Sequence, residues 1–141
     1  MSTYQIVVDT NVFVTALRSQ FGASYKLLSL IDKDIYKLNL SVPLVLEYEE
    51  VAKRMIGEIT LGEQEIDDIL DFVISNSNRW HIFYLWRPQL KDPSDDMVLE
   101  LAVTAGCKYI LTYNVNDFKG SKQFGIEAIT PKVFLELVGE L

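Results

Sequence analysis

The feature that most constrains the fold is a short apolar run near the N-terminus that ends in a carboxylate. Residues 4–8 read YQIVV, a near-continuous apolar stretch typical of a strand buried on both faces of a parallel sheet. Asp9 follows directly, and a carboxylate is costly to bury unless it is paired or has a function. The sequence therefore predicts a parallel sheet with a polar site at the end of its first strand.

Strand-like and helical segments alternate along the rest of the chain. Strands are expected over residues 4–8, 36–42, 109–112 and 126–129, with a further extended stretch over 80–86. Helices are expected over residues 12–18, 24–32, 43–56, 61–75, 95–105 and 131–138, and irregular connections over 76–79 and 87–94. The alternation predicts a three-layer α/β/α fold with a mainly parallel central sheet. A length of 141 residues fits one domain spanning residues 1–141.

The composition narrows the chemistry that the chain can perform. The single cysteine, Cys107, excludes an intrachain disulfide and a thiolate zinc cluster, and the single histidine, His81, excludes a two-histidine metal site within the chain. The net charge of −7 argues against a broad basic surface for nucleic acid, but a nuclease that uses a local cluster of acids is compatible with it. Any bound metal should be a hard ion such as Mg²⁺ or Mn²⁺, held mainly by carboxylates.

The sequence carries no sign of export or membrane insertion. No apolar run approaches the roughly 18–20 residues that cross a bilayer, and the first residues lack the basic region of a signal peptide. We therefore expect no contact with the membrane and a cytoplasmic location.

Acidic and amide side chains stand where the expected strands end or the expected helices begin. These positions converge on one edge of a parallel sheet, where ligands bind in such folds. Carboxylates gathered there would repel one another, and one or two hard cations would relieve the repulsion, activate water and stabilise a leaving oxygen. The candidate residues are Asp9, Glu47, Asp95, Asp96, Asn114 and Asp117.

Each acid taken alone also has an ordinary structural interpretation. Asp95 at a helix start is most simply a cap, and Glu47, beside Glu49 and Glu50, fits a solvated helix face. Asp117 alone would be a loop residue. Asp9 is the exception, because it ends a fully apolar strand. The hypothesis of a shared site therefore rests on the four positions together.

Four segments resemble motifs of the PIN domain family. The first is VVDTNVF at residues 7–13, and the second is LEYEEV at residues 46–51. The third is DPSDDMVLELA at residues 92–102, and the fourth is ILTYNVNDF at residues 110–118. The nearest branch is similar to the VapC-like toxin components of bacterial toxin–antitoxin pairs. This resemblance implies an endoribonuclease that depends on Mg²⁺ or Mn²⁺, is often dimeric, and is held inactive by a cognate antitoxin.

The resemblance also assigns roles to individual residues. Asp9 matches the first family acid, Glu47 the second, and either Asp95 or Asp96 the third; the choice of Asp95 places Leu99 and Ala102 on the same helix face. At the fourth motif, many relatives carry Asp where this chain has Asn114, and others carry Asn there with an Asp three residues later, as Asp117 is here. The polar residues that would support a ligand or water are Thr10, Asn11 and Thr112.

Several other residues have both a functional and a structural interpretation. Trp80, Phe83, Tyr84 and Trp86 could stack on bases, although a core or dimer surface is the simpler expectation. Possible phosphate contacts, each more simply a solvated charge, are Arg18, Lys53, Arg54, Lys119 and Lys122. His81 is expected to be structural or exposed, and Cys107 to be a small buried side chain.

The favoured function is a metal-dependent ribonuclease in which a metal-activated water attacks the phosphodiester and no side chain acts as the nucleophile. Two alternatives stay open. A degenerate PIN fold that only binds is kept open by Asn114, which is a neutral ligand. A DNA nuclease or a phosphatase could use the same acids.

Overall fold

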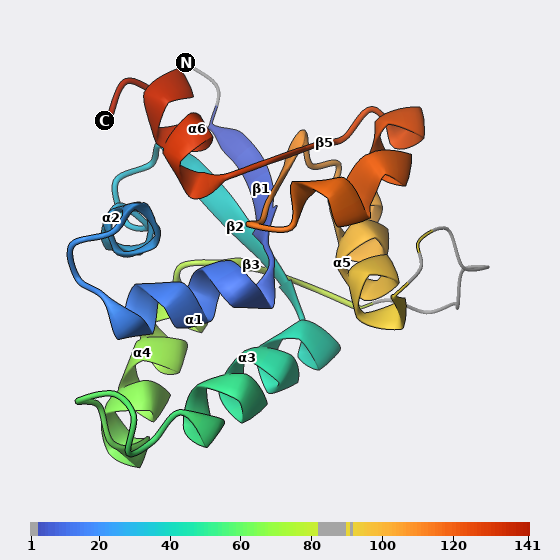
Figure 1. Ribbon diagram of the computed structural model, residues 1–141. Coiled ribbons are helices and arrows are strands. Elements are labelled where there is room, and N and C mark those ends of the chain that lie inside the picture. Colours follow the sequence, from blue (N-terminus) through green and yellow to red (C-terminus); the bar gives the residue numbers. More distant parts are fainter. Residues whose placement is uncertain (1–2, 82–89, 91) are drawn as a thin grey trace.

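The computed structural model describes residues 3–81, 90 and 92–141 and contains a five-stranded sheet in which every neighbouring pair is parallel (Figure 1). The strand order is β3-β2-β1-β4-β5, so the first strand lies at the centre. The strands are β1 (Tyr4–Val8), β2 (Tyr36–Ser41), β3 (Asn78–Trp80), β4 (Tyr109–Leu111) and β5 (Glu127–Ile129). This confirms the predicted parallel α/β sheet.

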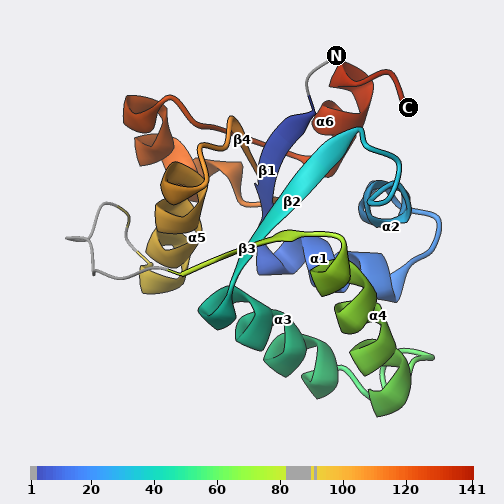
Figure 2. The same cartoon turned by 180° about the vertical axis from the view of Figure 1, so that it is seen from behind.

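Helices cover both faces of the sheet, which gives the three layers that the alternating pattern predicts (Figures 1 and 2). Helix α5 packs against β1, β2 and β4 on one face, with η1 beside it, whereas α1 to α4 lie on the other face. The elements are α1 (Thr10–Arg18), α2 (Ala23–Ser29), α3 (Val42–Arg54), α4 (Glu63–Ser75), α5 (Pro93–Thr104), the 3₁₀ segment η1 (Val115–Phe124) and α6 (Pro131–Leu137).

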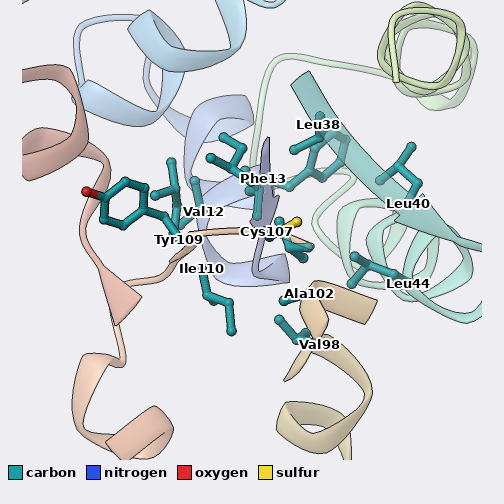
Figure 3. Packing of buried hydrophobic residues seen from close by; sticks show 14 of the residues in the cluster. Val12, Phe13, Leu38, Leu40, Leu44, Val98, Ala102, Cys107, Tyr109 and Ile110 are labelled. Atoms are coloured by element: carbon teal, nitrogen blue, oxygen red, sulfur yellow. The ribbon is translucent and has the colours of Figure 1, made fainter. Parts of the chain in front are cut away.

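The central strand is buried on both faces, as its unbroken apolar sequence predicts. Ile6 and Val7 are fully buried. Val98 and Ala102 of α5 approach the sheet from one side, and Phe13 of α1 lies on the other (Figure 3). Burial of apolar side chains from three layers in one cluster is the main force that holds the sheet and helices together.

Most helix boundaries follow from local capping chemistry. The Ser41 hydroxyl accepts from the backbone N–H of Leu44 at the start of α3, with Pro43 in the first turn. Thr130 caps α6 in the same way ahead of Pro131. Gly106 follows α5 with a φ of 67°, the left-handed backbone that glycine adopts without a steric penalty. The predicted starts near both prolines and the glycine after α5 are confirmed.

Three predicted helix starts are wrong by two residues. α4 begins at Glu63 rather than at residue 61, because Gly62 takes the N-cap position and the Glu65 side chain accepts from its backbone N–H. α1 begins at Thr10 rather than at residue 12, because the Asp9 carboxylate caps it. α5 begins at Pro93 rather than at Asp95, because Asp92 accepts a hydrogen bond from the backbone N–H of Ser94. The interpretation of Asp95 as the helix cap is therefore also wrong.

The predicted loop at residues 76–79 is wrong in its second half. Asn78 opens β3 and pairs with Asn39 of β2. The amide groups of Asn39 and Asn78 and the Trp80 indole add side-chain hydrogen bonds to this pairing, and residues 78 and 79 carry no alternating apolar pattern. Of the predicted extended stretch over 80–86, only residues 80 and 81 are described, and Trp80 is in β3. Phe83, Tyr84, Trp86 and residues 87–89 lie outside the described residues.

Within the described part of the chain, none of the helices has the length and apolar character needed to cross a bilayer.

Candidate active site

The candidate site lies where the direction of strand connections reverses. From β1 the chain continues to β2 on one side, whereas β4 lies on the other side of β1. Val8 pairs with Leu111, so the residues that follow them, Asp9 and Thr112, leave the sheet next to each other. Such a switch point at the carboxyl ends of parallel strands is the usual ligand site of an open α/β sheet.

Asp9 is fixed at this edge by hydrogen bonds to both of its carboxylate oxygens. Its Oδ1 accepts from the backbone N–H of Thr10 at 2.8 Å, and its Oδ2 accepts from the Thr112 hydroxyl at 2.8 Å and from the Asn11 amide at 3.3 Å. The side chain is only 8% exposed. Burial raises the pKa of Asp9, the hydrogen bonds from Thr112 and Thr10 lower it, and the charges of Glu47 and Asp117 raise it further. The net shift is upward, so the ionised form costs stability.

Glu47 reaches the same site from α3. Its Oε2 accepts a hydrogen bond from the Thr10 hydroxyl at 2.7 Å, which ties it to the residue after Asp9. The neighbouring Tyr48 fixes α3 against the strand end, since its hydroxyl donates to the Val8 carbonyl. The Tyr48 ring also stacks on Phe13, with ring centroids 4.6 Å apart. Glu47 therefore does not stand on a merely solvated face.

Asp95 and Asp96 have different surroundings although they are adjacent in α5. Burial raises the pKa of Asp95 to about 7, and the negative charges of Asp9, Asp92, Asp117 and Glu47 contribute to the rise. Asp96 instead accepts a hydrogen bond from the backbone N–H of Leu90 at 2.9 Å. Neighbouring helix positions point about 100° apart, which explains the division. Asp95 faces the other acids, and Asp96 holds the segment that leads into the helix.

The fourth motif follows β4 and turns into η1. The backbone N–H of Asn114 donates to the Thr112 hydroxyl, and Asn114 precedes the first turn of η1. Asp117 is exposed in that turn, yet its charge contributes to the raised pKa of both Asp9 and Asp95. The 3₁₀ turn between residues 114 and 117 thus brings Asp117 towards the acids of the other three motifs.

The donor chemistry of this edge fits a hard divalent cation. Oxygen donors are what Mg²⁺ and Mn²⁺ prefer, and a cation would offset the neighbouring negative charges that, after burial, contribute to the raised pKa of Asp95. In the described ranges, no group of three or more His, Cys, Asp and Glu side chains is placed to hold a metal ion. The acids therefore influence one another electrostatically, and binding of a metal ion would require their carboxylates to turn towards a common point.

The basic candidates have mostly structural surroundings. Lys53 forms ion pairs with Glu49 and Asp67, at 3.1 Å and 2.8 Å, and these join α3 to α4. The two carboxylates raise the pKa of Lys53. Arg54 pairs with Glu50, and the Arg18 guanidinium donates to the Met55 sulfur. Lys119 and Lys122 are exposed on η1.

The remaining candidates follow their structural interpretations where they are described. Cys107 is buried, and burial raises the pKa of its thiol to about 12. The Trp80 indole N–H donates to Asn39, so this aromatic side chain belongs to the sheet. His81 is exposed.

Sequence reasoning missed Tyr113 and Ser24. The backbone N–H of Tyr113 donates to the Asn11 amide oxygen, and its hydroxyl lies 2.5 Å from the Ser24 hydroxyl. Tyr113 lies inside the fourth motif, so its position between Thr112 and Asn114 was a usable signal. Ser24 carried none, because only the fold brings α2 to this loop.

A groove of about 650 Å³ lies at the other end of α1 and contains none of the candidate acids. Its walls come from the end of α1, from α2 and from α4. Phe21, which is 92% exposed, and the exposed rings of Tyr25 and Phe72 line it.

The parallel sheet with helices on both faces defines an α/β domain whose central strands end in oxygen-bearing side chains, where ligands bind in such folds. Residues 5–116 match the family model of the PIN domain, so the chain belongs to the PIN domain family, whose members are generally nucleases. The matched range includes Asp9, Glu47, Asp95 and Asn114 and ends one residue before Asp117. No curated protein sequence matches the chain.

Proposed function

We propose that this protein is an endoribonuclease that depends on Mg²⁺ or Mn²⁺ and acts in the cytoplasm as the toxin of a toxin–antitoxin pair. The observation that carries the nuclease function is the proximity of acids from the four motifs. Asp9 and Glu47 are joined through Thr10, and burial, with smaller contributions from neighbouring negative charges, raises the pKa of Asp95 to about 7. The four acids come from segments near the carboxyl ends of the central strands, the usual ligand site of such a sheet, where their mutual repulsion would have no structural benefit.

Asp9, Glu47, Asp95 and Asp117 would hold the cation, with Asn114 as a neutral ligand. A bound divalent cation supplies a water activated for attack on phosphorus and offsets charge on the leaving oxygen. The protein's own groups orient the acids: Thr112 and Asn11 fix the Asp9 carboxylate, and Thr10 fixes that of Glu47. Asp96 acts outside the ligand set, because its carboxylate is bonded to the backbone of Leu90.

The adjacent acids of α5 provide a matched pair of variants. Asp95→Asn should lower the rate of single-stranded RNA cleavage in Mg²⁺ by about 100-fold or more, because it removes a charge that faces the cation. Asp96→Asn should change the rate far less and should mainly lower the melting temperature. Equal, complete loss of cleavage in both variants at unchanged stability would contradict this assignment. A panel of RNA, DNA and small phosphomonoesters tests the substrate class.

A binding module without efficient catalysis is the second candidate. It is favoured by the neutral Asn114 and by the absence, in the described residues, of three acids already placed around one ion. Calorimetric titration with Mg²⁺ separates the two functions, since a nuclease should bind the ion and a binding module need not.

An antitoxin and a homodimer are proposed from the family branch alone. Co-expression with the product of a neighbouring gene and gel filtration test them.

A further inference from the structure

An exposed aromatic ring lies at the rim of the candidate active site. Tyr113 follows Thr112, whose hydroxyl donates to the Asp9 carboxylate, and its own backbone N–H donates to the Asn11 side chain at 3.2 Å. The backbone from which the ring extends is therefore fixed relative to the acids. The side chain is still 43% exposed.

The far end of the same ring is also held. The Tyr113 hydroxyl lies 2.5 Å from the hydroxyl of Ser24 in α2, and Ser24 is 1% exposed. The ring thus bridges from the end of β4 to α2, and its orientation is set before any ligand arrives. A rigid, partly exposed ring loses little conformational entropy when a flat partner packs against it.

Because the protein is acidic, binding of nucleic acid would gain from a contact with an aromatic ring that does not depend on positive charge. The net charge is −7, and Lys53 and Arg54 are engaged in ion pairs. Lys119 and Lys122, exposed on the η1 segment that follows the acidic edge, stay candidates for phosphate contact beside the ring. Stacking of bases on aromatic rings provides affinity that does not depend on positive charge.

We propose that Tyr113 is a stacking platform for one unpaired base next to the phosphate that binds at the acidic edge. This inference rests on the proposed nuclease function and specifies its substrate as single-stranded nucleic acid. In a duplex the faces of each base are covered by its neighbours, so only a splayed base can lie on the ring. The substrate backbone then runs along the acids while one base turns towards α2.

Three variants separate stacking from support of the fold. Tyr113→Leu removes the aromatic face. Tyr113→Phe and Ser24→Ala keep the ring and remove only the hydroxyl contact with α2. The probes are fluorescein-labelled single-stranded RNA dodecamers in Ca²⁺, one intact and a set each with one abasic position. Fluorescence anisotropy gives the dissociation constant, and thermal melting gives the stability of each variant.

The expected result is about tenfold weaker binding of the intact RNA by Tyr113→Leu, with at most about a twofold change for the other two variants. One abasic position should weaken wild-type binding by a similar factor and leave Tyr113→Leu unaffected. Unchanged binding by Tyr113→Leu overturns the stacking role alone. Equal losses of RNA affinity in all three variants mean that Tyr113 only joins β4 to α2 and does not stack on a base. If the wild type binds and cleaves no nucleic acid, the proposed function fails as well.

Discussion

Two polar clusters lie on the central strands of this sheet, and they follow opposite rules. In the middle of β2, Asn39 is fully buried, and its amide group donates to Gln5, Ile6 and Lys37 and accepts from Asn78 and Trp80. At the carboxyl end of β1, the carboxylate of Asp9 shares its surroundings with other carboxylates. One cluster is neutral and has its partners, and the other gathers charges of the same sign.

The difference separates polar groups that support the fold from polar groups that oppose it. The Asn39 cluster replaces the hydrogen bonds lost to water, so it helps to define which strands pair. Burial, with a smaller contribution from the neighbouring acids, raises the pKa of Asp9 and Asp95, which means that their ionised forms lower the stability of the folded protein. Groups of the second kind are found where a protein binds a ligand or carries out chemistry.

The largest expected effect is on activity. Asp9→Asn should reduce cleavage by at least about 100-fold, because it removes a charge that holds the cation. Its folded state should be as stable as the wild type or more so at neutral pH, since one repelling charge is lost. Cleavage assays in Mg²⁺ and thermal melting measure both. Wild-type cleavage rates would show that the acidic edge is not the active site.

The neutral cluster should respond in the opposite way. Asn39→Leu keeps the size of the side chain but removes the partners of Trp80, Asn78 and Gln5. Loss of buried hydrogen bonds should cost about 3 kcal/mol and lower the melting temperature by about 10 °C. Activity per folded molecule should be retained. A stability change within about 0.5 kcal/mol would mean that the cluster does not hold β3 in place.

A divalent cation should stabilise the folded protein through the acidic cluster. Mg²⁺ or Mn²⁺ should bind only the folded state, because its ligands lie far apart in sequence. At about 100 times the dissociation constant it should add about 2.7 kcal/mol of stability, or about 10 °C. Asn114→Asp should strengthen this shift by adding a charged ligand, and Asp9→Asn should weaken it. Monovalent salt at matched ionic strength controls for screening of the net charge. An unchanged melting temperature would favour the binding module.

The smallest effect is a change in the pH dependence of stability. The folded pKa of Asp95 is about 7 and its ordinary value is 3.8, so between these values the folded state binds the extra proton. Without metal, stability should therefore fall as pH rises from about 4 to 7, after which the loss from Asp95 is complete. In Asp95→Asn the curve should be flatter over this window. Identical slopes in the two proteins, measured by urea unfolding, would show that Asp95 does not face the other acids.

The elements that the sequence predicted well are those with a strong local signal. The apolar run from Tyr4 to Val8 predicted a central strand. Pro43 and Pro131 marked the starts of α3 and α6, and Gly106 marked the end of α5. The first two residues of β3 were missed, because the contacts of Asn78 are made by amide groups rather than by alternating apolar residues, whereas Trp80 lies in the predicted extended stretch. The 3₁₀ turns of η1 were also missed, since short turns leave no periodic pattern.

The candidate site could be predicted as a set of residues but not as a geometry. The positions of strand ends and helix starts identified the acids of the four motifs, and their assignment as one site stays a prediction. The different surroundings of Asp95 and Asp96 depend on where α5 begins, and that start is set by Asp92. The bond between Tyr113 and Ser24 joins residues 89 positions apart, and no local pattern encodes it.

The origin of the acids in four separate segments has a consequence during synthesis on the ribosome. Asp9 and Glu47 emerge early, but Asp95 and Asp117 follow only after most of the chain has been made. The central strand β1 obtains its second neighbour only when β4 is available, so the acidic edge cannot assemble on a shorter nascent chain. Translation proceeds at roughly 5–20 residues per second, so several seconds separate the first acid from the last. On the proposed function, a ribosome-bound fragment that lacks Asp117 should therefore be inert, and cleavage should begin only after the fourth motif has been translated.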